Sequence, residues 1–202
     1  MASEFVSEVR RYLRSIRYHI LFISLIFLLS MMSGIMYGAL DPTFSEELMS
    51  ELGEEFGGLT ELPPPLIMLS IFGRNAGLSF ITLIVGIGFG LVPIAFIAIN
   101  GFMVGIVVKI AEQEAGIFFV IMAILPHGII ELPMVFLSAA IGLKLGHEVL
   151  LLLLTGESHI KEESVKGLRI FSFLVVPLLF ISAIIEVYIT STIIWMMNNS
   201  LG

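Results

Sequence analysis

Long apolar runs separated by short polar segments dominate the pattern of this chain. The first run extends from Tyr18 to Leu40, and the last extends from Ile170 to about Met197. Each has the roughly 20 residues that an apolar helix needs to cross the hydrocarbon core of a bilayer. We therefore predict a transmembrane helix at 18–40 and another at 170–197, with Trp195 as an interfacial anchor.

The apolar run at 76–111 is too long for a single crossing. As one helix it would reach about 54 Å, whereas the hydrocarbon core is about 30 Å thick. A group of helix-disturbing residues interrupts the run near its middle: Gly86, Gly88, Gly90 and Pro93. Because glycine and proline weaken helices, we predict a hairpin of two helices, 76–91 and 93–111.

A further apolar run, 117–145, also contains residues that disturb a helix. Pro126, Gly128 and Pro133 lie near its middle, and an internal proline removes a backbone hydrogen bond. We predict a kinked or discontinuous span at 117–145, followed by a polar cytoplasmic loop at 146–169. Four ionisable residues of this loop are interpreted as ordinary solvated side chains: His147, Glu148, His159 and Glu162.

The segment between the first span and the hairpin is acidic. Asp41-Pro42 ends the first span because proline cannot continue the helical hydrogen-bond ladder. Acidic and apolar residues then alternate at helical spacing from 43 to 56, which predicts a short amphipathic helix outside the membrane. Paired glycines and three consecutive prolines follow. We predict an acidic extracytoplasmic loop at 41–75.

Residues 1–17 combine apolar and basic positions. Apolar side chains recur at helical spacing at Phe5, Val9, Leu13 and Ile16, with four arginines between and beside them. This pattern predicts an amphipathic helix at the membrane surface, leading into the first span. A plain solvated helical extension would show the same pattern.

The composition places the chain in the membrane. Of 202 residues 57% are hydrophobic and 13% charged, with a mean hydropathy of +1.05, more apolar content than a soluble domain of this size can bury. We predict an all-α fold, a single polytopic transmembrane helix bundle of about five spans. No basic stripe points to a nucleic-acid partner, and the absence of cysteine excludes disulfides and thiolate sites.

The distribution of basic residues predicts the orientation. With five spans and a cytoplasmic N-terminus, Arg74 and Lys109 fall outside and the other basic residues fall inside. A single span at 76–111 would divide the basic residues evenly between the two sides. The positive-inside rule therefore favours five spans in a multi-pass protein of the cell membrane, with the N-terminus in the cytoplasm.

One group of residues could carry chemistry inside the membrane. His127 and Glu131 lie four residues apart in the stretch from Pro126 to Pro133, so a helical turn puts them on one face. Glu186 lies near the middle of the last span. Such residues are costly in hydrocarbon, and three interpretations stay open: a divalent metal site, a proton or cation relay, or a hydrogen-bonded cluster that fixes helix packing.

Zinc would be the most suitable metal for this histidine and carboxylate set. A metalloprotease is disfavoured because Gly128 follows His127, where the zinc-protease motif has its general-base glutamate. No Ser/His/Asp set or phosphate loop is visible, so we assign no catalytic residue. Asn100-Gly101 and Gly105 favour close helix packing, either inside the fold or in a homodimer.

Taken in order, three elements resemble the stage II sporulation protein M family. They are Asn100-Gly-Phe-Met-Val-Gly105, Leu125-Pro-His-Gly-Ile-Ile-Glu-Leu-Pro133 and Ile185-Glu186, and the resemblance covers residues 18–197. The Pro-His-Gly-x-x-Glu element is its specific part. The resemblance implies that Pro126, His127, Gly128, Glu131, Pro133, Glu186, Asn100 and Gly101 are motif positions.

The resemblance also implies a role. In spore-forming bacteria, family members anchor a membrane complex with cell-wall-remodelling proteins, and relatives occur in organisms that do not sporulate. At fold level the family is similar to the permease subunits of ABC-type exporters. We expect a non-enzymatic scaffold in the lipid bilayer, as a homodimer with membrane or cell-envelope partners. The alternatives are a transporter-like subunit or a metal-binding intramembrane protein.

Overall fold

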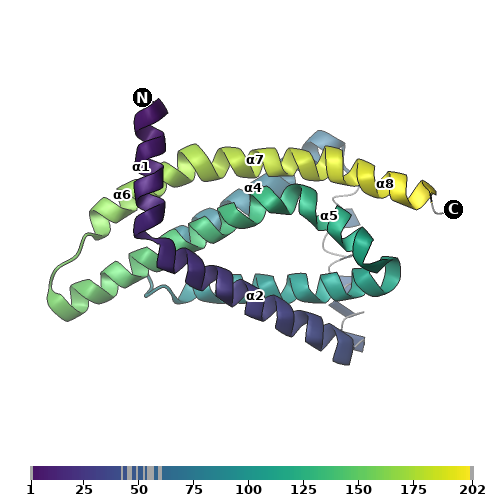
Figure 1. Cartoon of the computed structure of the whole chain (residues 1–202), viewed down its shortest axis with the longest axis horizontal. Helices are drawn as coiled ribbons and strands as arrows, with labels where there is room; N and C mark the ends of the chain where they lie inside the picture. Colours follow the sequence, from purple (N-terminus) through teal and green to yellow (C-terminus); the bar gives the residue numbers. More distant parts are fainter. Residues whose placement is uncertain are drawn as a thin grey trace.

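The structure is a computed structural model that describes residues 2–41, 43–44, 47–48, 50–51, 53, 57–58 and 61–200, without the side chains of Ala2, Ser3, Asn198 and Ser200. Every regular element in this part of the chain is a helix, which confirms the all-α prediction (Figure 1). The short amphipathic helix predicted at 43–56 falls mostly outside the described residues.

The structure describes seven helices and two π-helical segments in chain order. They are α1 (Ala2–Ser15), α2 (Arg17–Leu40), α4 (Pro64–Val85), α5 (Leu91–Thr155), α6 (Ile160–Ile170), the π-helical segment η1 (Phe171–Val175), α7 (Val176–Ile184), the π-helical segment η2 (Ile185–Thr190) and α8 (Ser191–Ser200). From α6 to α8 they form one continuous rod that runs along the whole bundle (Figure 1).

The bundle is made of long apolar helices. Within the described ranges, four helical stretches are long and apolar enough to cross a membrane: Arg17–Leu40, Pro64–Val85, Leu91–Thr155 and Ile160–Met197. The third reverses direction at Gly116, whose φ of 83° and ψ of 164° suit glycine and not other residues (Figure 1). With the two halves of α5 counted separately, the described part of the chain holds four to five candidate spans, and the chain is a multi-pass membrane protein.

The start of α4 differs from the prediction. The sequence pattern placed the second span at 76–91 and assigned 64–75 to the acidic loop, but α4 begins at Pro64. Three consecutive prolines indicate a chain break when read from the sequence. Proline is nevertheless well suited to the first turn of a helix, because the missing N–H has no partner there in any case.

The predicted polar loop at 146–169 is also largely helical. α5 continues to Thr155 and ends at Gly156, whose φ of 77° is a left-handed cap, and α6 begins at Ile160. Glu148 is 2% exposed and ties the end of α5 to the chain that follows it. Its carboxylate accepts hydrogen bonds from Lys144 Nζ at 2.6 Å and from the backbone N–H of His159 at 2.8 Å. The interpretation of Glu148 as solvated was therefore wrong.

Glycine allows the helices to approach closely. Gly101 and Gly105 of α5 lie against the backbone of α2, and a Cβ at Gly101 would stand 2.6 Å from the Phe27 carbonyl oxygen. Gly34 of α2 faces the same contact. In a bilayer, where lipid competes for apolar surface, such small-residue contacts hold helices together. The glycine spacing in the sequence is thus used inside the monomer.

The N-terminal helix α1 lies across one end of the bundle (Figure 1). Its Tyr12 is buried, as is Ile16 just after it, whereas the arginines of α1 are exposed. Glu8 pairs with Arg169 of α6 at 2.8 Å. Burial, together with the nearby Glu163 carboxylate, raises the pKa of the Tyr12 phenol above its ordinary range, so Tyr12 packs as a neutral side chain.

Candidate functional site

The Pro-His-Gly-x-x-Glu stretch lies in the second half of α5, which stays helical through both prolines. His127 and Glu131 are therefore one turn apart and share a face. This half of α5 is bent in Figure 1, as expected for a helix that contains Pro126 and Pro133. Its face with His127 and Glu131 contacts the α7–η2 part of the last pass.

Hydrogen bonds join the two passes at this point. Ser182 Oγ of α7 lies 3.1 Å from the backbone carbonyl oxygen of His127 and 3.3 Å from Oε2 of Glu131. His127 Nδ1 lies 3.4 Å from Thr190 Oγ1 of η2. Ser182 and Thr190 are 0% and 3% exposed, so both hydroxyl groups are withdrawn from lipid and water.

Two further residues complete the group. Asn75 of α4 lies within hydrogen-bonding reach of the Glu131 carboxyl group. Glu186 of η2 is close enough to Glu131 for the two carboxyl groups to interact electrostatically. We call the resulting set the interhelical polar cluster: Asn75, His127, Glu131, Ser182, Glu186 and Thr190. It connects three passes of the bundle.

Half of this cluster was not predicted from the sequence. Ser182 and Thr190 each lie four residues from Glu186, so the three form a polar stripe in an otherwise apolar helix. That spacing could have identified them. Asn75 carried no such signal, because its segment was assigned to a loop.

The cluster coincides with an irregular part of the last pass. In η2 the backbone N–H of Ser191 donates to the Glu186 carbonyl oxygen, five residues earlier, and Ser191 Oγ contacts the same oxygen at 3.2 Å. The earlier π-helical segment, η1, precedes Pro177 near the start of α7, where the ladder lacks one donor. No proline accounts for η2. Such π-helical turns are frequent at functional sites.

The structure does not show the predicted metal site. Among the residues that the structure describes, no three His, Asp or Glu side chains are arranged so that they could hold a metal ion. His127 is directed to the Thr190 hydroxyl, and Glu131 to Ser182 and Asn75. The donors expected for zinc thus contact hydroxyl and amide groups in this structure.

Asn100, Gly101 and Gly128 make contacts within and between the helices. Asn100 Nδ2 donates to the Phe96 carbonyl oxygen of its own helix at 2.7 Å. Gly101 permits the approach of α2 described above. A Cβ at Gly128 would lie near Ile124 and Leu132 of its own helix.

Comparisons with known proteins agree with the motif. The family model described as Stage II sporulation protein M matches residues 23–191, a range that contains the whole interhelical polar cluster. An uncharacterized protein of the archaeon Methanocaldococcus jannaschii is 36% identical over 126 residues, which cover 61% of this chain and 71% of that protein. No solved structure matches. This chain belongs to the stage II sporulation protein M family.

Proposed function

We propose that this protein is a non-enzymatic membrane scaffold that holds a complex at the bilayer. The observation that carries the proposal is the way the interhelical polar cluster uses its polar groups. Ser182, Thr190 and Asn75 contact His127 and Glu131, so these groups join α4, α5 and the last pass to one another. A cluster of this kind supports a fixed arrangement of helices.

A fixed bundle can present constant surfaces to partners. The segment between α2 and α4 is rich in glutamate, with Glu46, Glu47, Glu51, Glu54, Glu55 and Glu61. In the sequence it follows the first pass. We propose it as the contact for membrane or cell-envelope partners on the extracytoplasmic side, because a dense acidic segment favours basic partner surfaces.

The proposed orientation gives the first testable prediction. Cysteine in place of Glu157, in the α5–α6 turn, will react with an impermeant maleimide only after the cytoplasmic face is opened. Cysteine in place of Gln113, near the Gly116 reversal, will react in intact cells. Both positions are exposed, and the proposed topology of five passes would put them on opposite sides of the membrane. Equal reactivity of the two in intact cells would contradict this topology.

The functional test compares complex assembly with ion flux. We expect in-membrane crosslinking to recover the chain in a complex of reproducible mass. The Glu131→Gln variant should lower the amount of this complex in parallel with the amount of folded protein. Purified protein in sealed vesicles should pass protons and potassium no faster than empty vesicles do.

One observation favours transport as the alternative. Glu131 and Glu186 bring two carboxyl groups together inside the bundle, an arrangement that also suits a proton or cation relay. A transporter predicts flux that Glu131→Gln abolishes while assembly is unchanged, which is the opposite of the result expected for a scaffold.

A homodimer remains part of the proposal, but the glycine spacing no longer supports it. Gly101 and Gly105 are covered by α2 within one copy. A dimer would therefore use another surface, and Gly101→Ala should affect folding before it affects self-association. Crosslinking of two differently tagged copies in one membrane measures the association directly.

A further inference from the structure

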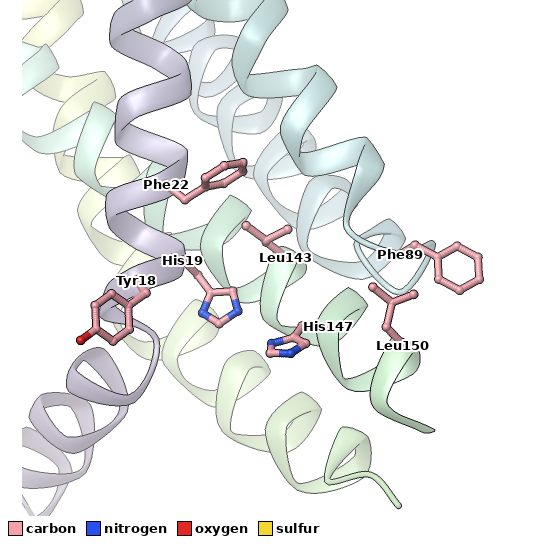
Figure 2. A pocket seen from close by; sticks show the side chains of 7 residues that line it. All are labelled: Tyr18, His19, Phe22, Phe89, Leu143, His147 and Leu150. Carbon is pink, nitrogen blue, oxygen red and sulfur yellow. The ribbon is translucent and has the colours of Figure 1, made fainter. Parts of the chain in front are cut away.

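A second polar site lies at the end of the bundle where α1 is found, away from the interhelical polar cluster. It is a pocket of about 440 Å³ between the start of α2, the α4–α5 turn and the later part of α5. Most of its lining is apolar, contributed by Phe22, Phe89, Leu143 and Leu150. Figure 2 shows two imidazole rings, those of His19 and His147, side by side in this pocket.

The two imidazoles are placed to bind one ligand together. Their ring centroids are 5.6 Å apart, with an angle of 39° between the ring planes. His19 Nδ1 is buried, and no described residue offers it a hydrogen-bond partner. A buried polar atom of this kind costs free energy unless something binds to it. His147 is exposed at the opening of the pocket.

The charges around the pocket decide the sign of that ligand. Lys144 of α5 interacts electrostatically with His19, and Arg17 lies beside Tyr18, which lines the pocket. Glu148 also interacts electrostatically with His19, but it forms an ion pair with Lys144 at 2.6 Å, so these two charges largely offset each other. No acidic side chain of the described residues lines the pocket, so a cation meets no carboxylate there, whereas an anion meets imidazole donors and the positive charge of nearby Arg17.

The position of the pocket indicates how an anion reaches it. Phe22, Phe89 and Leu150 are all exposed on the outside of the bundle, where lipid chains surround it. Arg17 and Tyr18 mark the start of the first pass, at the level of the lipid headgroups. An anionic headgroup at this level would lie beside the imidazoles, with its acyl chains against the aromatic and leucine side chains.

We propose that this pocket binds the phosphate of an anionic phospholipid. His19 and His147 donate N–H groups to the phosphate oxygens, and Arg17 supplies positive charge nearby. One acyl chain lies along Phe22 and Leu150. The site would hold a specific lipid at one edge of the bundle, and it does not depend on the scaffold function.

The test uses the full-length protein, freed of lipid in a neutral detergent, with binding measured by native mass spectrometry. The probes are phosphatidylglycerol and phosphatidylcholine with identical chains, inorganic phosphate, and Zn²⁺ alone. We expect phosphatidylglycerol to bind at least tenfold more tightly than phosphatidylcholine. His147→Phe should weaken that binding about tenfold, because it removes the donor from a charged acceptor while an aromatic ring remains.

Two further variants complete the design. His19→Phe should weaken phosphatidylglycerol binding as His147→Phe does. Because position 147 is exposed, we expect the His147→Phe variant to fold. His159→Phe is the matched control, since its side chain is 78% exposed and lies outside the pocket. Three results would each overturn the proposal: equal binding of the two lipids, tight binding of inorganic phosphate without lipid, or Zn²⁺ binding that both pocket variants abolish.

Discussion

Gly105→Leu is expected to prevent stable packing of α2 against α5. The Gly105 Cα faces the Met31 carbonyl oxygen and the Gly34 Cα, and both belong to backbone that cannot turn aside. A leucine side chain must therefore separate the two helices along their closest contact. Overpacking commonly costs 1–3 kcal/mol, and against backbone we expect about 3 kcal/mol or more. Thermal unfolding of the purified protein in detergent, followed by size-exclusion chromatography, measures the loss.

Gly77→Leu is the matched control for this change. Gly77 also lies inside a helix, α4, but nothing stands within 4 Å of the position its Cβ would take. The control should stay within about 0.5 kcal/mol of the parent, as surface substitutions generally do. Equal unfolding midpoints for Gly105→Leu and Gly77→Leu would show that α2 and α5 do not pack as described.

Glu131→Leu is expected to produce the second large loss, about 2 kcal/mol. Leucine has a similar size but offers no acceptor to Ser182 or to Asn75, and both would be left without the Glu131 carboxyl group between the passes. Glu131→Gln keeps an oxygen at the same place and should lose less. Unfolding midpoints in a mixed-detergent titration would order the parent, Gln and Leu proteins in that sequence.

The control for Glu131→Leu is Glu157→Leu, an exposed glutamate in the α5–α6 turn. It replaces the same carboxylate by leucine where no buried partner loses a hydrogen bond. The unfolding midpoint should therefore stay nearly unchanged. If Glu131→Leu unfolds at the midpoint of the parent protein, the cluster does not hold the passes together.

Hydropathy and helix-breaking residues predicted the number of passes because the bilayer fixes the length of an apolar helix. The glycines at 86–90 did separate two helices, and Gly116 allowed the reversal that divides α5. The boundary at Pro64 could not be read in the same way. A run of prolines predicts the end of one element, but it does not tell whether the last of them begins the next helix.

Polar residues near the helix ends were harder to place than apolar ones. Glu148 has the appearance of a loop residue in the sequence, yet it is buried because Lys144 and the backbone of His159 both reach it. The second of these contacts depends on how the chain turns back after Thr155. Such a contact joins residues whose proximity no local pattern determines.

The candidate site was likewise predictable only in part: its ionisable residues could be identified, but their partners could not. His127, Glu131 and Glu186 were identifiable because ionisable residues are rare in apolar spans. Which partners they contact depends on how the last pass rotates against α5, and the π-helical turn η2 changes that rotation. The sequence therefore indicated the glutamates and the histidine but left a metal, a relay and a packing cluster open.

The most direct test of the scaffold proposal is the reactivity of cysteine at position 182. The natural chain has no cysteine, and Ser182→Cys is nearly isosteric at the centre of the interhelical polar cluster. In sealed vesicles of either orientation, a small charged methanethiosulfonate should leave this thiol unmodified and should modify it fully after denaturation. Rapid modification from either side of the folded protein would reveal an aqueous path and contradict the scaffold.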